Sequence, residues 1–361
     1  MRIKKCRICN NIKLVRIGSL GRISISNFTN TPSQGNKYPL ELVYCQDCSL
    51  LQLAHNTPRR LLFSSYWYQS RINKVIVGDL KDIAKDCFGV HIDIAANDGT
   101  LLKYSKAKIK IAVEPSNIKP DGFKWIQDYW ENVTTKQADT ITAIACLYAL
   151  PNPNKFMRNI TAHLKPKGVF IAQLMTLQPF IKKNDIGNIC HEHLLYYSYK
   201  SLVRLYEQNG LEIYKVEKNK INGGSYRLFA RHFKKGSINL KEKTYGVKEF
   251  KEFFERIKNN RRKMIVFLKT LLKTHNVVGF GASTKMGTIV QYYKTGPKVI
   301  VDVDPAKLGK YTVDGAVIVD KIPKHTEYLW VFPYGFIDYF KKKEKNYKGL
   351  WVTTIPNFKI V

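Results

Sequence analysis

The sequence predicts an α/β protein in which a cysteine-bearing segment precedes two units that alternate strands with helices. Three observations support this fold class. From Val90 onwards short apolar runs alternate with stretches of helical periodicity, a second alternation opens at Val277, and two C-x-x-C pairs precede both. Such alternation indicates mostly parallel, doubly wound sheets. We therefore divide the chain into regions 1–60, 61–240 and 241–361.

The first region shows little helical periodicity, so we expect it to be loop-rich, with turns at 18–21 and 31–36. Its two C-x-x-C pairs present four thiolates, which suits one tetrahedral Zn²⁺ ion. Four thiolates leave no open position for substrate, so the zinc would be structural and would help stabilise a segment too short for its own core. Redox-active or coincidental pairs are the alternative. The predicted ligands are Cys6, Cys9, Cys45 and Cys48.

The other elements follow from the spacing of apolar residues. Helices are predicted at 70–86, 156–164, 199–209 and 246–274, the last as one long helix or two. Strands are predicted at 90–95, 109–114, 140–147 and 169–174, as a pair within 211–233, and from 277 onwards.

The turn after the strand at 90–95 is a candidate nucleotide-binding loop. Ligands of open α/β sheets bind beyond the carboxyl ends of the strands, and an acid that ends the next strand, here Glu114, suits a ribose diol. Ala95 and Ala96 stand where a dinucleotide fingerprint has glycines, which disfavours NAD and favours an adenosyl ligand without phosphates, such as S-adenosylmethionine. An ordinary structural turn is the alternative. The cofactor-binding candidates are Asp93, Ala95, Asn97, Asp98, Gly99 and Glu114.

Two imidazoles, a carboxylate and two phenols lie close together in residues 191–197. His191 and His193 are spaced i,i+2, whereas a metal pair on a helix needs i,i+4. On an extended segment both imidazoles would face one side, with Glu192 on the other. The segment therefore carries either a base oriented by a neighbouring carboxylate or a pair of metal ligands.

Two later segments suit an anionic substrate. Residues 222–227 place a flexible Gly-Gly turn beside an arginine, although a plain hairpin turn has the same pattern. Residues 279–287 combine glycines, two hydroxyls and Lys285 at a helix start, which suits a diphosphate; an ordinary glycine-rich turn is the alternative. The loop is not a Walker A motif, whose lysine follows glycine. The substrate-binding candidates are Tyr197, Asn222, Ser225, Arg227, Gly281, Ser283, Lys285, Asp304 and Lys307.

The net charge is +32, from 60 Lys and Arg against 28 Asp and Glu. Such a surplus raises nucleic acid, a membrane surface or a polyanionic small molecule as partners, but a lysine-rich solvated surface explains it equally well. No apolar run approaches the ~18 residues of a spanning helix, and the start lacks a signal-peptide core. We expect a cytoplasmic protein that binds neither membrane nor nucleic acid. An odd number of cysteines, seven, also favours a metal in a reducing compartment over disulfides.

Taken in order, these motifs resemble one family, the zinc-containing, S-adenosylmethionine-dependent sugar C-methyltransferases that act on nucleotide-linked deoxy-ketosugars. The resemblance spans nearly the whole chain. The motifs are Cys6-Arg7-Ile8-Cys9, Tyr38-Pro39-Leu40 ahead of Cys45-Gln46-Asp47-Cys48, Ala96-Asn97-Asp98-Gly99, Glu114-Pro115-Ser116, His191-Glu192-His193, Gly223-Gly224-Ser225, Gly279-Phe280-Gly281-Ala282-Ser283 and Asp304-Pro305-Ala306-Lys307.

The resemblance implies a class I methyltransferase, Rossmann-like domain that binds the methyl donor. An N-terminal zinc-binding module would help cover the active site, and a C-terminal Rossmann-like α/β domain would hold the nucleotide of the substrate. His193 is the implied base, with Glu192 and His191 beside it and Tyr68 lining the same site. The implied cofactors are S-adenosylmethionine and structural Zn²⁺, and the implied partner is a nucleotide-diphosphate sugar. We expect a monomer or a weak dimer.

Three residues depart from the family pattern. Cys190 stands where members that methylate sugar C3 carry tyrosine, Asn222 where histidine is common, and Gln173 where an acid often ends the strand. These departures leave the methylated carbon open.

The implied reaction begins with removal of a proton α to a ketone by His193, oriented by Glu192, while nearby phenols hydrogen-bond the enolate oxygen. The enolate carbon then attacks the sulfonium methyl group. The competing interpretations are an O- or N-methyltransferase of a sugar or other small molecule, a zinc-ribbon protein that binds or methylates nucleic acid, and an NAD-dependent oxidoreductase.

Overall fold

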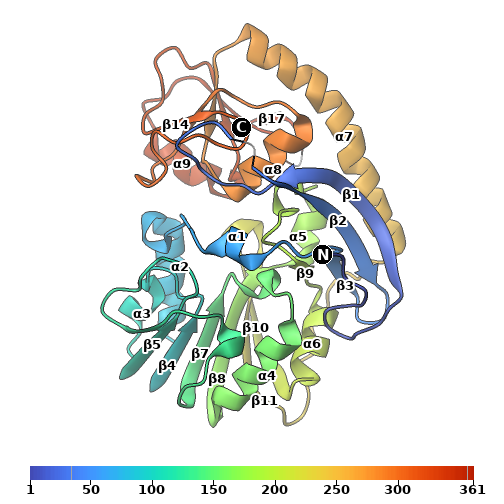
Figure 1. Ribbon diagram of the computed structural model, residues 1–361, viewed down its shortest axis with the longest axis vertical. Coiled ribbons are helices and arrows are strands. Elements are labelled where there is room, and N and C mark those ends of the chain that lie inside the picture. Colours follow the sequence, from blue (N-terminus) through green and yellow to red (C-terminus); the bar gives the residue numbers. More distant parts are fainter. Residues whose placement is uncertain (34, 356) are drawn as a thin grey trace.

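The computed structural model describes residues 1–33, 35–355 and 357–361, and the strands of these residues form three sheets (Figure 1). An N-terminal sheet has the order β1-β2-β3-β9, a central sheet β10-β11-β8-β7-β4-β5-β6 and a C-terminal sheet β14-β13-β12-β15-β16-β17. No helix within the described ranges is both long and apolar enough to cross a bilayer.

The central sheet is mostly parallel, as predicted. Strands β4 to β8 run parallel to one another, and β11 lies antiparallel between β8 and β10. Its strands are β4 (Val90–Ile94), β5 (Ile109–Val113), β6 (Lys124–Ile126), β7 (Ala138–Ile144), β8 (Leu164–Met175), β10 (Leu211–Asn219) and β11 (Ser225–His232). Its helices are α2 (Lys74–Ala84), α3 (Thr100–Tyr104), α4 (Pro153–His163), α5 (Leu177–Lys182) and α6 (Tyr199–Glu207).

Helices cover both faces of this sheet. In β8, Ile171 packs in one apolar cluster with residues of α2 and α3, whereas its neighbours Phe170 and Ala172 join the main core with residues of α4 and α6. Successive side chains of a strand point to opposite faces, so the two clusters lie on opposite sides. Short helical turns connect the elements: η1 (Ser70–Ile72), η2 (Trp130–Asn132), η3 (Leu147–Ala149), η4 (Ile186–Asn188), η5 (Ile221–Gly223) and η6 (Tyr334–Phe336).

The N-terminal region has long loops, as predicted, but it also contains a sheet that the sequence analysis did not predict. Its strands are β1 (Leu14–Ser24), β2 (Lys37–Cys45) and β3 (Leu50–Leu53), and the two-residue β9 (Leu195–Tyr196) pairs with β3 from far along the chain. Residues 18–21, predicted to form a turn, instead belong to β1, where the register with β2 shifts between Arg16 and Gly18 and again between Ser19 and Gly21. Tertiary packing decides the outcome, because Leu40, Leu42 and Leu51 are fully buried in the main core.

One long helix, α7 (Val247–Thr274), follows the central sheet and resolves the choice between one helix and two. It runs along the outer side of the N-terminal strands up to the C-terminal sheet (Figure 1). Close packing requires Gly18 of β1, because a Cβ there would lie 2.3 Å from the ring of Phe254.

The C-terminal sheet is a second parallel α/β unit with one antiparallel edge strand. Its strands are β12 (Val277–Phe280), β13 (Val299–Val301), β14 (Val317–Val319), β15 (Tyr328–Val331), β16 (Leu350–Thr353) and β17 (Lys359–Ile360), and its helices are α8 (Thr284–Tyr293) and α9 (Ile337–Lys343). The short helix α1 (Arg59–Phe63) lies between this unit and the central one (Figure 1). Except for β9, the strands of each sheet all come from one predicted region. The boundaries between the regions, at residues 60 and 240, remain predictions.

Candidate active site

The four predicted zinc ligands meet at one point. Their Sγ atoms lie within 4.8 Å of one another, with 3.5 Å between Cys6 and Cys48 and between Cys9 and Cys45. Thiolates at about 2.3 Å from a tetrahedral zinc are roughly 3.8 Å apart, so the donors fit this ion. Burial raises the pKa of Cys9 to about 12, and the contact with Cys6 raises the pKa of Cys48. A bound dication would offset this by favouring the thiolates.

Hydrogen bonds from Arg7 connect the cysteine cluster to β3. The Arg7 guanidinium donates to Gln52 Oε1 at 3.1 Å and to the Leu53 carbonyl at 2.6 Å. The Leu53 amide donates in turn to the Leu194 carbonyl at 2.9 Å, next to the His193 segment. The metal module therefore supports the back of that segment.

The turn after β4 is shaped by left-handed residues and by one carboxylate. Ala95, Asn97 and Gly99 have φ angles of 55°, 54° and 76°. The Asn97 amide donates to Glu114 Oε2 and the Ser116 amide to Glu114 Oε1, each at 2.8 Å. Glu114, just beyond β5, is thereby fixed in one orientation, and its remaining lone pairs are free for a diol, as the sequence predicted for it.

Asp93 lies beside this turn at the end of β4. Its carboxylate is buried and accepts from Thr142 Oγ1 at 2.6 Å. Burial raises the pKa of Asp93 to about 7. A cation bound nearby would favour its charged form.

Asn97 and Asp98 hold the aromatic segment 66–71 over the turn. Asn97 Nδ2 donates to the Tyr68 carbonyl at 2.8 Å, and Asn97 Oδ1 accepts from the Ser70 amide at 2.9 Å. Asp98 Oδ2 accepts from the Arg71 amide at 2.9 Å. The side chains of Asn97 and Asp98, both predicted to bind the cofactor, thus form hydrogen bonds within the protein.

His193 has the geometry of a general base. Its Nδ1 donates to the Asn188 carbonyl at 3.2 Å, and in the described chain Nε2 makes no hydrogen bond, so the lone pair of the neutral ring is on Nε2. Burial, and next the positive charge of Lys285, lowers the pKa of His193 to about 3. The imidazole is therefore neutral at pH 7. The group that orients His193 is the Asn188 carbonyl. The sequence had suggested Glu192 for this role.

Glu192 lies beside His193 with an unsatisfied oxygen. Its Oε2 is buried, and no partner for this atom lies among the described residues. Burial raises the pKa of Glu192 to about 7, and the neighbouring Cys190 thiol partly offsets this by hydrogen bonding. A buried acceptor without a partner is a place for a ligand donor.

The turn after β12 approaches the same region from the C-terminal unit. Gly281 has a φ of 88°, and a Cβ there would lie 2.6 Å from Pro333, so only glycine fits. Ser283 caps α8 by accepting from the Met286 amide at 3.3 Å. Lys285 Nζ is 3.8 Å from Asp185 Oδ2. A helix start with a lysine is suited to an anion.

Lys307 is held by its own unit. Its Nζ donates to the Ala282 carbonyl at 2.9 Å and pairs with Asp302 at 3.2 Å and with Asp304 at 3.6 Å. It also lies 4.3 Å from the ring centroid of Trp67 in the aromatic segment. Lys307 thus fastens that segment to the C-terminal unit.

The Gly-Gly turn between β10 and β11 adds a third wall. Asn222 adopts a left-handed φ of 53°. Ser225 Oγ donates to the Ile221 carbonyl at 2.9 Å, and Lys183 Nζ donates to the Gly223 carbonyl at 3.0 Å. The side chain of Ser225 thus stabilises the turn by a hydrogen bond to its backbone.

All of these walls enclose one cavity of about 490 Å³, a size typical of small-molecule sites. The predicted residues that line it are Tyr68, Asp93, Ala95, Asn97, Glu114, Glu192, His193, Asn222, Ser225, Gly281, Ser283, Lys285, Asp304 and Lys307. Asp98 and Gly99 are not among its lining residues.

Three family models match the chain in succession. Residues 6–63 match "Putative zinc binding domain", residues 68–216 match "Methyltransferase domain", and residues 220–356 match "C-methyltransferase C-terminal domain". The C-methyltransferase NovU of Streptomyces niveus is 24% identical over 333 residues, which cover 78% of this chain and 76% of the relative.

Together, these three matches and this relative support a zinc-binding C-methyltransferase. The chain is an S-adenosylmethionine-dependent methyltransferase with a class I fold, as predicted.

Solved methyltransferases show more distant likeness. The mitomycin 7-O-methyltransferase MmcR is 12% identical, with a TM-score of 0.38 over 45% of this chain and 55% of that protein. An S-adenosylmethionine-dependent methyltransferase from Clostridium acetobutylicum is 13% identical, with a TM-score of 0.33 over 43% of this chain and 89% of that protein.

The residues of this C-methyltransferase suit both cofactors. The four cysteines suit zinc, and the alanine-bearing turn with the fixed Glu114 suits an adenosyl group. Bound S-adenosylmethionine would supply a methyl group on a cationic sulfur. The buried Asp93 would face that cationic ligand from the end of β4.

Two residues of the 191–198 segment are not brought to the cavity. His191 Nε2 lies 3.3 Å from the Tyr38 carbonyl of β2, and the Tyr197 hydroxyl donates to the Leu147 carbonyl at 3.1 Å. The segment is a turn at this point and not an extended strand, so Glu192 and His193 face the cavity while His191 faces β2. The expectation that both imidazoles share a side was wrong.

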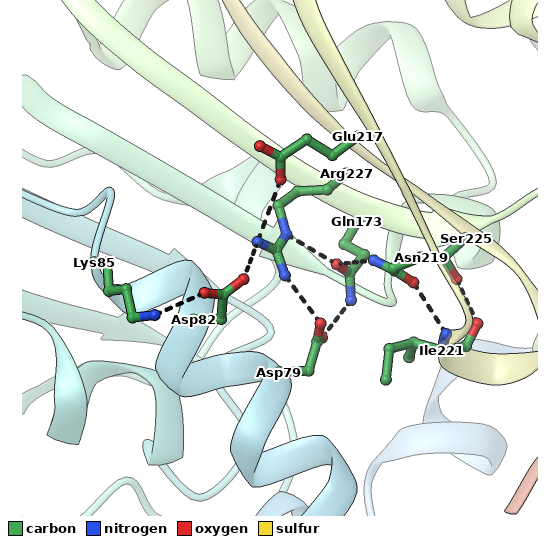
Figure 2. A network of polar contacts seen from close by, with 9 residues as sticks. All are labelled: Asp79, Asp82, Lys85, Gln173, Glu217, Asn219, Ile221, Ser225 and Arg227. Atoms are coloured by element: carbon green, nitrogen blue, oxygen red, sulfur yellow. Dashed lines mark hydrogen bonds and ion pairs between the residues drawn. The ribbon is translucent and has the colours of Figure 1, made fainter.

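Arg227, predicted to bind substrate, is instead buried in an ion-pair network (Figure 2). Its guanidinium pairs with Asp79 at 2.9 Å and Asp82 at 2.8 Å, both on α2, and donates to Gln173 Oε1 at 3.1 Å. Gln173 Oε1 also accepts from Asn219 at 2.8 Å, so the network continues towards the Gly-Gly turn. Arg227 thus joins α2 to the sheet, and its donors are not free for a ligand.

Several lining residues escaped the sequence analysis. Tyr148 follows β7, so the rule that ligands bind beyond strand ends would have found it. Asn188 carries no sequence signal, because its role depends on the bend of η4 that brings its carbonyl to His193. Tyr334 and Asp185 meet across the two units at 2.6 Å, which only the tertiary structure reveals.

Proposed function

We propose that this C-methyltransferase acts on a nucleotide-linked keto-deoxysugar, by removing a proton α to the ketone and methylating the resulting enolate carbon. The observation that carries the proposal is the orientation of His193. Its Nδ1 donates to the Asn188 carbonyl at 3.2 Å, so Nε2 carries the lone pair that would act as a base. His193 lines the cavity between the turn after β4 and the turn after β12.

The electrostatics around His193 favour a base that responds to substrate. The positive charge of Lys285 contributes to its low pKa. An anionic diphosphate next to Lys285 would offset that charge and raise the pKa of the imidazole, so the base strengthens as the acceptor binds. We expect the rate to fall on the acid side, where the imidazole is protonated.

The C-terminal turn supports an acceptor that carries a diphosphate. The N-terminus of the ten-residue helix α8 and Lys285 both favour an anion. The unsatisfied Oε2 of Glu192 would accept a hydrogen bond from a sugar hydroxyl.

The test is a product analysis. The full-length, zinc-loaded protein is incubated with methyl-labelled S-adenosylmethionine and a panel of nucleotide 4-keto-6-deoxysugars in D₂O. NMR then reports methyl transfer, the atom methylated and deuterium exchange at the α carbon. We expect a new C–CH₃ group, and exchange without transfer when the donor is omitted. Methylation of a hydroxyl oxygen would contradict the enolate reaction, and no transfer to any panel member would contradict the acceptor class.

The base is tested by His193→Gln beside the matched control His191→Gln. Both histidines belong to one turn, but only His193 lines the cavity. We expect exchange and transfer to fall at least about 10²-fold in His193→Gln, as for loss of a positioned base, and to stay near wild type in His191→Gln. Wild-type exchange in His193→Gln would rule out this base.

A further inference from the structure

We infer that Tyr148 is a further catalytic residue, whose phenol donates the hydrogen bond that the acceptor's carbonyl oxygen needs as it becomes an enolate oxygen. The inference rests on the proposed function and identifies which phenol serves the enolate. Tyr68, which the resemblance placed in the site, would line the cavity without filling this role.

Tyr148 is in direct contact with the base. It lies in η3 directly after β7, and its ring centroid is 4.3 Å from that of His193, with an angle of 62° between the planes. Tyr148 lines the main cavity and also the small recess next to it, which reaches Asn222 and Tyr334. In the described part of the chain its hydroxyl forms no hydrogen bond, so its donor is unused.

Most of the neighbouring phenols interact with other groups. Tyr196 donates to the Asn188 carbonyl at 2.9 Å, and Tyr334 donates to Asp185 at 2.6 Å. Burial raises the pKa of Tyr68 to about 12, although the nearby Ser70 hydroxyl partly offsets this rise. Tyr66 lies near Glu192, whose charge adds to the effect of burial on the Tyr66 pKa. Tyr66 is therefore the competing donor.

The chemistry requires a base and a donor side by side, because the α carbon is separated from the carbonyl oxygen by only the carbonyl carbon. Burial, and next the phenols and thiols nearby, raises the pKa of Tyr148 well above its usual value. The phenol therefore keeps its proton and acts as a hydrogen-bond donor throughout the reaction.

The step balances with the residues named. The α proton moves to Nε2 of His193, the C–H electron pair becomes the carbon–carbon double bond, and the carbonyl π pair moves to the oxygen that Tyr148 holds. The enolate carbon then takes the methyl group as the S–CH₃ pair stays on sulfur. The proton leaves His193 for solvent after the product departs.

The test is Tyr148→Phe, which removes only the hydroxyl. We expect the rate of α-deuterium exchange and kcat for transfer to fall in parallel by about 10²- to 10³-fold, as on removal of one oxyanion donor. KM for the sugar nucleotide and donor affinity should change less than threefold, because the bond strengthens only as charge develops. Binding of the corresponding 4-hydroxy sugar nucleotide, which has no carbonyl, should match wild type.

Two controls make the result decisive. Tyr206→Phe removes a buried hydroxyl that has no hydrogen bond among the described residues and lies outside the cavity, so we expect wild-type exchange. Tyr66→Phe tests the competitor. Wild-type exchange in Tyr148→Phe, or a loss confined to Tyr66→Phe, would overturn the inference while the proposed function stands. Absence of exchange in the wild-type protein on every panel sugar would instead overturn the proposed function, and this inference with it.

Discussion

The turn after β4 and the turn after β12 occupy equivalent positions in two α/β units, yet different charged side chains line them. The first is lined by the acids Glu114 and Asp93, whereas the second carries Lys285 at the start of α8 and the ion pair of Lys307 with Asp304. Under the proposed function, a methyl donor with a cationic sulfur would meet acids at the first turn, and an acceptor with an anionic diphosphate would meet Lys285 at the second. We expect one strand-to-helix geometry to serve these two ligands through the few charged side chains that differ.

Glu114→Gln gives the largest expected change. Both oxygens of Glu114 accept backbone amides at 2.8 Å, and the glutamine NH₂ would face one of these donors. We expect the donor Kd to rise about 100-fold, since a hydrogen bond to a charged group contributes about 1.5–3 kcal/mol. Calorimetry should show unchanged binding of the sugar nucleotide. Equal losses for both ligands, or a similar loss in the control Glu217→Gln, would break the comparison.

Lys285→Met tests the other turn and keeps an unbranched side chain of nearly the same length. Loss of the ammonium should raise the Kd of the nucleotide diphosphate about 10- to 30-fold and leave the donor Kd unchanged. The control is Lys298→Met, an exposed lysine of the same unit. The opposite pattern, with weaker donor binding only, would refute the assignment of the donor to the turn after β4 and of the diphosphate to the turn after β12.

Donor affinity should depend on pH through Asp93. Its pKa is raised by burial from 3.8 to about 7, and a cationic donor would lower it, so binding below pH 7 releases a proton. The donor Kd should therefore decrease as pH rises to about 7 and then level off, by at most about tenfold per pH unit. Titrations in buffers of different ionisation enthalpy count the proton. An identical slope in Asp93→Asn would show that another group is responsible.

Zinc removal should affect both turns least. The cysteine cluster supports β3, and β3 pairs with β9 next to the His193 segment. The N-terminal region also reaches the turn after β12, where Ser26 Oγ donates to the Thr284 carbonyl at 3.1 Å, but this contact involves none of the four cysteines. In Cys48→Ser we expect a lower melting temperature, reduced zinc content and slower transfer, but less than a threefold change in either ligand's Kd. A tenfold loss for one ligand only would place that ligand against the module.

Local patterns predicted the fold and the two turns well, because strand periodicity and turn residues act over short distances. The zinc cluster followed from spacing alone. The first region was misjudged because Leu40 and Leu42 are buried against distant elements. Arg227 and His191 were misassigned for the same reason, since only the tertiary structure shows that α2 and β2 already use their polar atoms. A residue type suited to a ligand suits a protein partner equally well.

The pairing of β3 with β9 also constrains biosynthesis. Leu51 and Gln52 leave the ribosome early, but their partners Tyr196 and Leu195 follow only after the intervening 142 residues, 53–194, have been made. At roughly 5–20 residues per second the nascent sheet keeps an open edge for about 7 to 28 seconds. Such an edge recruits other chains, so a cell that makes this protein at low temperature or with chaperones should gain soluble yield.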